Sequence, residues 1–269
     1  MKMNFECISV ERRGAVAWLF HNRPEARNAE SRQLLDELDA ALGEAVANDT
    51  VRVIVIAGKG EHFSAGHDLK EAQSSRSAFT VEQRYAYEET RYFDYALRIW
   101  DCPKPTIASV QGACMAGGFM VANMCDMMVA SEDAFFSDPV CQSLASAAVE
   151  VLVHPWVMGL RAAHEFLLTG RRMSAQEAHR LGMVNHVVPR DQLDERTTEL
   201  AEKVAGAYPF AAKLVKRSLK RAADIQGFRA SLQSHFDTHQ LSHVSDEYRR
   251  MREAGLAAGI ARGKGASGT

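Results

Sequence analysis

In the first half of the chain, segments whose apolar residues have the two-residue period of a strand are interspersed with segments that have the period of a helix. Residues 6–20 alternate in twos around Gly14 and predict a β-hairpin, and residues 51–57 form a short β-branched run that predicts a buried strand. Between them, residues 31–46 carry apolar side chains at helical spacing behind Ser31, a residue that can cap the helix. The pattern continues with a helix expected over 85–100 and strands over 106–110 and 127–130. Strands that alternate with helices predict an α/β fold with parallel strands.

In the second half of the chain, the apolar residues recur mostly at helical spacing. Ser174 and Glu177 have the spacing of a capping box at the start of a helix. Amphipathic helices are expected over 191–206 and 210–222, with a last helix over 246–261. We therefore divide the chain into a core, residues 1–200, and a C-terminal helical region, residues 201–269.

Composition narrows the class of protein. The chain has 269 residues, of which 46% are hydrophobic, and a formal net charge of −2. This near-neutral balance argues against nucleic acid as a partner, and the sequence lacks an apolar run long enough to cross a membrane. Its five cysteines include no Cys-x-x-Cys pair. These features predict a reduced, cytoplasmic protein.

Two glycine-containing segments, residues 62–71 (HFSAGHDLKE) and 111–120 (QGACMAGGFM), each join a predicted strand to a predicted helix. The first N–H groups of a helix have no partner within the helix. Two such turns that converge would form an oxyanion hole, which stabilises negative charge developing on a carbonyl oxygen. Gly117 and Gly118 weaken a helix start, so either close packing or a ligand must need the backbone there.

The chain resembles the crotonase family, the enoyl-CoA hydratases, isomerases and their relatives. The resemblance is carried by residues 22–29 (NRPEARNA), 63–69 (FSAGHDL), 105–126, 166–170 (FLLTG) and 175–185. It implies a spiral of ββα units, C-terminal helices that mediate formation of a trimer or a dimer of trimers, and an acyl-CoA thioester as substrate. Coenzyme A would be part of that substrate, and the resemblance implies neither a further cofactor nor a metal.

The resemblance also implies roles for individual residues. The N–H groups of Ala65 and Gly117 would form the oxyanion hole. The substrate and CoA would be contacted by Ala26, Arg27, Ala29, Gly66, His67, Asp68, Leu69, Met115, Gly118, Met120, Pro139 and Val140. Some of these have simpler explanations: Arg27 as a surface cation, and His67 as a local hydrogen-bonding group. Asp68 and Glu71 have the spacing of a helix N-cap and its reciprocal partner.

The chain departs from the family pattern where the hydratases carry their two glutamates, because Met120 and Val140 occupy those positions. Neither side chain can transfer a proton. Other family members carry a carboxylate further along, and Glu150 is the nearest match here. Its apolar neighbours predict a raised pKa and a catalytic role, unless it is a surface or subunit-interface glutamate. Asp138, which also suits a turn, and His154 are weaker candidates.

Two functions remain open at this stage. The first is an acyl-CoA-processing enzyme that stabilises a thioester enolate and carries out isomerisation, hydration or another enolate reaction. The second is a catalytically silent acyl-CoA-binding or assembly subunit, which the loss of both glutamates favours.

Overall fold

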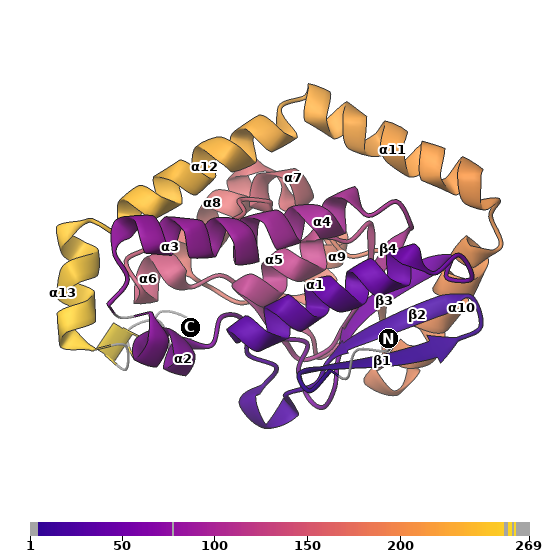
Figure 1. Cartoon of the computed structure of the whole chain (residues 1–269), viewed down its shortest axis with the longest axis horizontal. Helices are drawn as coiled ribbons and strands as arrows, with labels where there is room; N and C mark the ends of the chain where they lie inside the picture. Colours follow the sequence, from indigo (N-terminus) through magenta and orange to yellow (C-terminus); the bar gives the residue numbers. More distant parts are fainter. Residues whose placement is uncertain (1–4, 77, 256–257, 260, 262–269) are drawn as a thin grey trace.

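A mixed sheet organises the computed structural model, which describes residues 5–76, 78–255, 258–259 and 261 (Figure 1). Its strands lie in the order β1-β2-β3-β4-β6-β9. The predicted hairpin is confirmed as the antiparallel pair β1 and β2, and the later strands pair in parallel. The bounds are β1 Ile8–Arg13, β2 Val16–His21, β3 Val53–Gly58, β4 Thr106–Val110, β6 Met127–Ser131 and β9 His186–Val188.

Helices cover both faces of this sheet. All positions of β2 and β3 are buried, which explains why their sequences are mostly apolar and do not alternate between apolar and polar residues. The helix α1, Arg32–Ala47, packs with Ile54 and Ile56 on one face, and α10, Leu193–Ala205, packs with Val53 and Val55 on the other. The Ser31 hydroxyl accepts a hydrogen bond from the Leu34 N–H over 3.2 Å, which confirms the predicted cap.

The middle of the chain builds the wall of the site. A second, smaller sheet has the order β5-β7-β8, with β5 Ala113–Met115, β7 Phe135–Ser137 and β8 Met173–Ser174. The helix predicted over 85–100 is interrupted by a π-helical turn, Glu89–Asp94, between α3 and α4. π-helical turns are frequent at functional sites. The other bounds are η1 Pro24–Ala26, α2 Leu69–Ser75, α3 Val81–Glu88, α4 Tyr95–Asp101, α5 Gly117–Met124 and α6 Val140–Ser143.

The C-terminal half is mostly helical, as predicted. The bounds are α7 His154–Met158, α8 Leu160–Thr169, α9 Ala175–Arg180, η3 Arg190–Gln192, α11 Pro209–Ile225, α12 Phe228–Ser242 and α13 Asp246–Ala254. The sequence pattern did not predict the long helix α12 or the short helix α7. Ser174 caps α9 as predicted, but the Glu177 carboxylate pairs with Arg171 rather than closing the capping box. The end of the last predicted helix lies partly outside the described residues.

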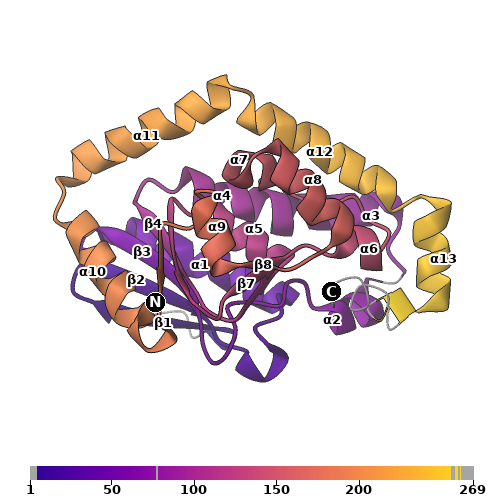
Figure 2. The same cartoon turned by 180° about the vertical axis from the view of Figure 1, so that it is seen from behind.

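The last helices run along the edge of the molecule and return toward the site. Figures 1 and 2 show α11 and α12 as an arch, from which α13 turns back toward α2. The helix α12 contacts α3 through a hydrogen bond from Gln240 to Glu88. Within the described residues no helix has the length and apolar character needed to cross a bilayer. The boundary expected at residue 200 falls inside α10, which packs on the main sheet.

Candidate active site

The two glycine-containing turns lie against each other. The Ser64 N–H donates to the Ala113 carbonyl over 3.1 Å, and the Met115 N–H donates to the Ser64 carbonyl over 3.0 Å. A Cβ on Gly66 would lie 2.7 Å from the Met115 carbonyl oxygen and 3.1 Å from the Gly117 nitrogen. Gly66 also has a φ of +83°, so glycine is required there by conformation and by space.

The N–H group predicted at Ala65 is not available to a ligand, because it donates to the Arg27 carbonyl over 3.0 Å. The assignment of Ala65 to the oxyanion hole is therefore wrong. The backbone of Glu30 pairs with the Gly66 carbonyl and the Asp68 N–H, which turns the His67 N–H to the opposite side of the chain. Across the described part of the chain, neither this N–H nor that of Gly117, the first residue of α5, has an acceptor.

Gly117 is crowded on its other side. A Cβ there would lie 2.0 Å from Glu30 Oε2 and 2.6 Å from the His67 ring. The preceding Ala116 has a φ of +46°, a conformation that costs free energy for a residue with a Cβ. Gly118 is explained by packing, since its Cβ would lie 2.6 Å from the Ser64 side chain.

His67 joins two buried carboxylates. Its Nε2 lies 3.0 Å from Glu150 Oε2 and its Nδ1 lies 3.2 Å from Glu30 Oε2, while its ring stacks on Tyr92 with centroids 3.8 Å apart. A ring with an acceptor at each nitrogen is held as imidazolium. The carboxylates outweigh burial and raise the pKa of His67 to about 10. The Glu150 pKa, which we predicted to be raised, is well below its ordinary value because His67 outweighs desolvation.

A second group of polar residues continues from Glu150 toward α12. His239 Nε2 lies 3.7 Å from Glu150 Oε1 and 3.4 Å from Glu88 Oε2. The Glu88 carboxylate also accepts hydrogen bonds from Arg84 and from Gln240. His239 Nδ1 lies 2.9 Å from the Ala148 carbonyl, which fixes the ring. Carboxylates and imidazoles thus alternate from the glycine-containing turns to α12.

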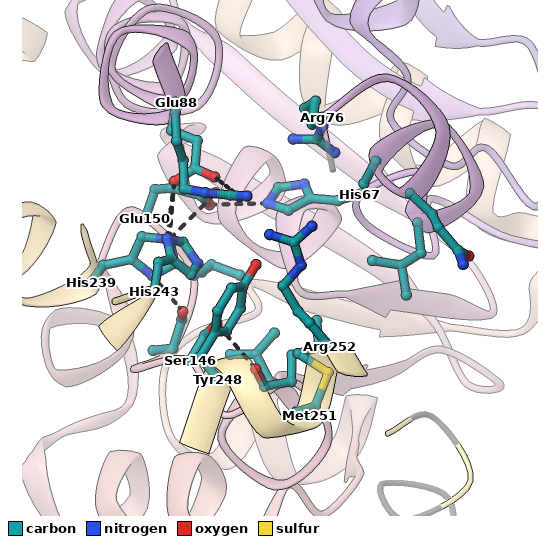
Figure 3. A pocket seen from close by; sticks show the side chains of 18 residues that line it. His67, Arg76, Glu88, Ser146, Glu150, His239, His243, Tyr248, Met251 and Arg252 are labelled. Carbon is teal, nitrogen blue, oxygen red and sulfur yellow. Dashed lines mark hydrogen bonds and ion pairs between the residues drawn. The ribbon is translucent and has the colours of Figure 1, made fainter. Parts of the chain in front are cut away.

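These groups border a cavity of about 240 Å³ (Figure 3). Figure 3 shows the His67, Glu88, Glu150, His239 and His243 side chains gathered on one side, with the Arg252 and Tyr248 side chains from α13 beside them. The lining residues are His67, Leu69, Ala72, Gln73, Arg76, Arg84, Glu88, Val140, Leu144, Ser146, Ala148, Val149, Glu150, His239, His243, Tyr248, Met251 and Arg252. The chain covers this cavity with its own α12 and α13.

One trio of these residues has the donors for a metal ion. Glu88, His239 and His243 each place one ligand atom within 4.8 Å of the others. Hydrogen bonds from Arg84 and Gln240 already hold the Glu88 carboxylate, and His239 faces two carboxylates. The arrangement is accounted for as an ion-paired cluster.

The other predicted candidates for proton transfer belong to the core. Asp138 is fully buried, accepts hydrogen bonds from the Val140 and Val149 N–H groups, and lies 3.3 Å from His154. The His154 ring stacks on Phe119. Neither Asp138 nor His154 borders the cavity, and their contacts fix the loop that carries Glu150. Both residues are therefore structural.

The remaining predicted residues divide between the cavity and its surroundings. Leu69 and Val140 line the cavity, whereas Met120 is buried in the core beside α1 and α4. Asp68 caps α2 and pairs with Arg23, which confirms its structural explanation. Glu71 instead accepts from the Arg32 N–H, so it is not the reciprocal partner in that cap. The contacts predicted for CoA with Ala26, Arg27, Ala29, Met115 and Pro139 remain predictions.

Sequence reasoning missed most of the polar side chains that line the cavity or lie behind His67. Glu30, Arg76, Glu88 and His239 lie far apart in the chain and show no common motif. The one available signal is on α12, where His235, His239 and His243 recur at four-residue spacing on one face.

Comparison with known proteins agrees with this architecture. The family model described as enoyl-CoA hydratase/isomerase matches residues 11–258. A Mycobacterium tuberculosis protein named as a candidate enoyl-CoA hydratase, EchA13, is 41% identical over 248 residues, which are 86% of this chain and 78% of that protein. The peroxisomal Δ(3,5)-Δ(2,4)-dienoyl-CoA isomerase of Arabidopsis thaliana is 32% identical over 82% of this chain and 84% of its own.

A solved structure covers nearly the whole fold. The enoyl-CoA hydratase/isomerase from Xanthobacter autotrophicus Py2 superimposes with a TM-score of 0.91 and 34% identity over 99% of this chain and 100% of that one. The α/β core, the helical C-terminal region and the match across most of the sequence lead to one conclusion: this chain belongs to the enoyl-CoA hydratase/isomerase family, the crotonase superfamily, and is an enzyme of that family.

Proposed function

We propose that the protein isomerises the double bond of an enoyl-CoA through a thioester enolate, with Glu150 as the group that transfers the proton. The observation that carries the proposal is the position of Glu150. Its carboxylate lies on the cavity wall, 3.0 Å from the imidazole of His67. His67 belongs to one of the glycine-containing turns, and its backbone N–H faces away from Glu30.

The thioester oxygen would bind between the N–H groups of His67 and Gly117. Donors preorganised for a developing oxyanion stabilise it more than the ground-state carbonyl. The His67 imidazolium adds a positive charge in a site from which most water is excluded. This matters because an ion-paired carboxylate such as Glu150 is a weak base, so strong stabilisation of the enolate must compensate.

The reaction then needs one carboxylate. Glu150 takes a proton from Cα of a 3-enoyl-CoA, and the C–H electron pair forms the enolate. When the enolate collapses, the double bond moves into conjugation and Cγ takes the proton from Glu150, which is ionised again. Hydration needs a water positioned by acid and base groups, and Val140 and Met120 supply neither.

The assembly and compartment are part of the proposal. Exposed apolar side chains on α11 support a trimer or a dimer of trimers. All five cysteines are free and four are buried, which agrees with the reducing cytoplasm.

Two substrates distinguish the chemistries. We expect conversion of 3-hexenoyl-CoA to the conjugated isomer at the rate usual for isomerases of this family. The reaction is monitored through the absorbance of the conjugated enoyl thioester. Hydration of crotonyl-CoA is expected to be at least about 10²-fold slower than isomerisation, because general acid–base groups contribute about that much each. Rapid hydration would overturn the isomerase assignment. Tight binding of both thioesters with neither reaction would support the silent acyl-CoA-binding subunit.

A further inference from the structure

Arg76 lies at the C-terminal end of α2 and lines the same cavity as Glu150, yet no carboxylate of the described residues forms an ion pair with it (Figure 3). Only 5% of its surface is exposed. Among the residues that the structure describes, its guanidinium makes one hydrogen bond, from Nη1 to the Tyr92 hydroxyl over 3.2 Å, and no ion pair with a carboxylate. Its Nε is buried without a hydrogen-bond partner.

This arrangement costs free energy unless a ligand completes it. Burying a charge is expensive when no opposite charge accompanies it, and the rings of Tyr87 and Tyr92, 4.9 and 5.9 Å from the guanidinium carbon, compensate only in part. A guanidinium with unused donors matches a carboxylate, which can accept two parallel hydrogen bonds from it.

Both carboxylates of the cavity lining already have a cationic partner. Arg84 pairs with Glu88, and His67 pairs with Glu150, so these carboxylates have cations of their own. Neither of these glutamates forms an ion pair with the buried guanidinium of Arg76.

We propose that the acyl group of the substrate ends in a carboxylate that Arg76 binds, so that the enzyme acts on the CoA monothioester of a dicarboxylic acid. This inference rests on the proposed function, because it places the acyl group in the cavity bordered by Glu150. The thioester would lie at His67 and Gly117, and the distal carboxylate at the guanidinium.

Matched saturated thioesters test the inference without relying on turnover. Glutaryl-CoA and valeryl-CoA have acyl chains of equal length and differ in the terminal carboxylate. Their dissociation constants are measured by calorimetry, together with those of the shorter pair succinyl-CoA and butyryl-CoA. In at least one pair the diacid is expected to bind about tenfold more tightly or better to the native enzyme.

Variants assign the preference to one side chain. Arg76→Met is expected to bring the ratio to about one while leaving the affinity for the neutral thioester intact, and Arg76→Lys to retain part of the preference. Arg98→Met, at an exposed arginine paired with Asp39, is the control and is expected to keep the native ratio. If Arg76→Met does not fold, Arg76→Gln is used for the same measurement.

Equal binding of diacid and neutral thioesters by the native enzyme would overturn this inference and leave the proposed function standing. A preference that survives in Arg76→Met would also overturn it. Failure of every thioester to bind would overturn the proposed function as well.

Discussion

The His67 ring lies 3.0 Å from the carboxylate of Glu150 and, through its other nitrogen, 3.2 Å from that of Glu30. The two carboxylates come from segments more than a hundred residues apart, and the imidazolium stabilises both. The same residue contributes an N–H that faces away from Glu30. In the proposed function, His67 would therefore connect the backbone donors of the oxyanion hole to Glu150, the group proposed to transfer the proton.

The ion pairs of His67 predict how stability depends on pH. Its pKa rises from an ordinary 6.5 to about 10 on folding. The stabilisation is complete below pH 6.5, declines as pH rises between the two values and is lost above the folded pKa. Thermal denaturation from pH 6 to 10 is expected to show a falling midpoint, with a flatter dependence in His67→Gln. Identical slopes for the two proteins would contradict the ion-paired state.

The same groups predict the pH profile of isomerisation. The Glu150 pKa lies below its ordinary 4.5, so its basic form persists at all pH values above that point. The rate is expected to show no acid limb above about pH 5 and to fall on the alkaline side as His67 loses its proton near pH 10. An acid limb near pH 6 or 7 in kcat/KM would identify a different base.

Gly117→Ala tests the backbone donors. The new Cβ would collide with Glu30 Oε2 and the His67 ring, which would displace the first N–H of α5 from the proposed oxyanion position. Isomerisation is expected to fall about 10²-fold or more, the usual effect of losing an oxyanion donor. Gly43→Ala is the control, because a Cβ there meets nothing within 4 Å and alanine favours the helix. Equal activity of both variants would remove Gly117 from the site.

The helix α11 predicts self-association. It exposes apolar side chains that one subunit does not cover: Phe210, Leu214, Val215 and Leu219, with Tyr208 and Ile225 at its ends. Such a surface is typical of an interface between subunits. Light scattering at micromolar concentration is expected to give the mass of a trimer or a hexamer. Leu219→Glu is expected to shift the mass toward the monomer, and a native protein that is already monomeric would contradict the prediction.

The fold could be predicted from the sequence because its signals are local. The apolar runs at β2 and β3, the cap at Ser31 and the glycine-containing turns each depend on a few neighbouring residues. The helix α12 could not be predicted from the sequence, because its buried positions carry a mixture of aromatic, polar and histidine side chains and not a continuous apolar stripe.

The site could be predicted only in part, because its chemistry comes from contacts between distant segments. The apolar neighbours of Glu150 identify it as a candidate and predict a raised pKa, but the pKa is lowered because His67 lies beside the carboxylate. The motif alone points to Ala65 as an oxyanion-hole donor. Its N–H is taken by the Arg27 carbonyl, a contact that no local pattern indicates.

Exchange of the Cα hydrogens of butyryl-CoA in D₂O, followed by mass spectrometry, tests the central claim most directly. Butyryl-CoA has no double bond, so exchange reports enolate formation alone. The native enzyme is expected to incorporate deuterium. Glu150→Gln is expected to lose incorporation by about 10²-fold or more with its dissociation constant nearly unchanged, whereas Glu44→Gln, at an exposed position of α1, behaves as native. Native-rate exchange by Glu150→Gln would contradict the assignment of Glu150.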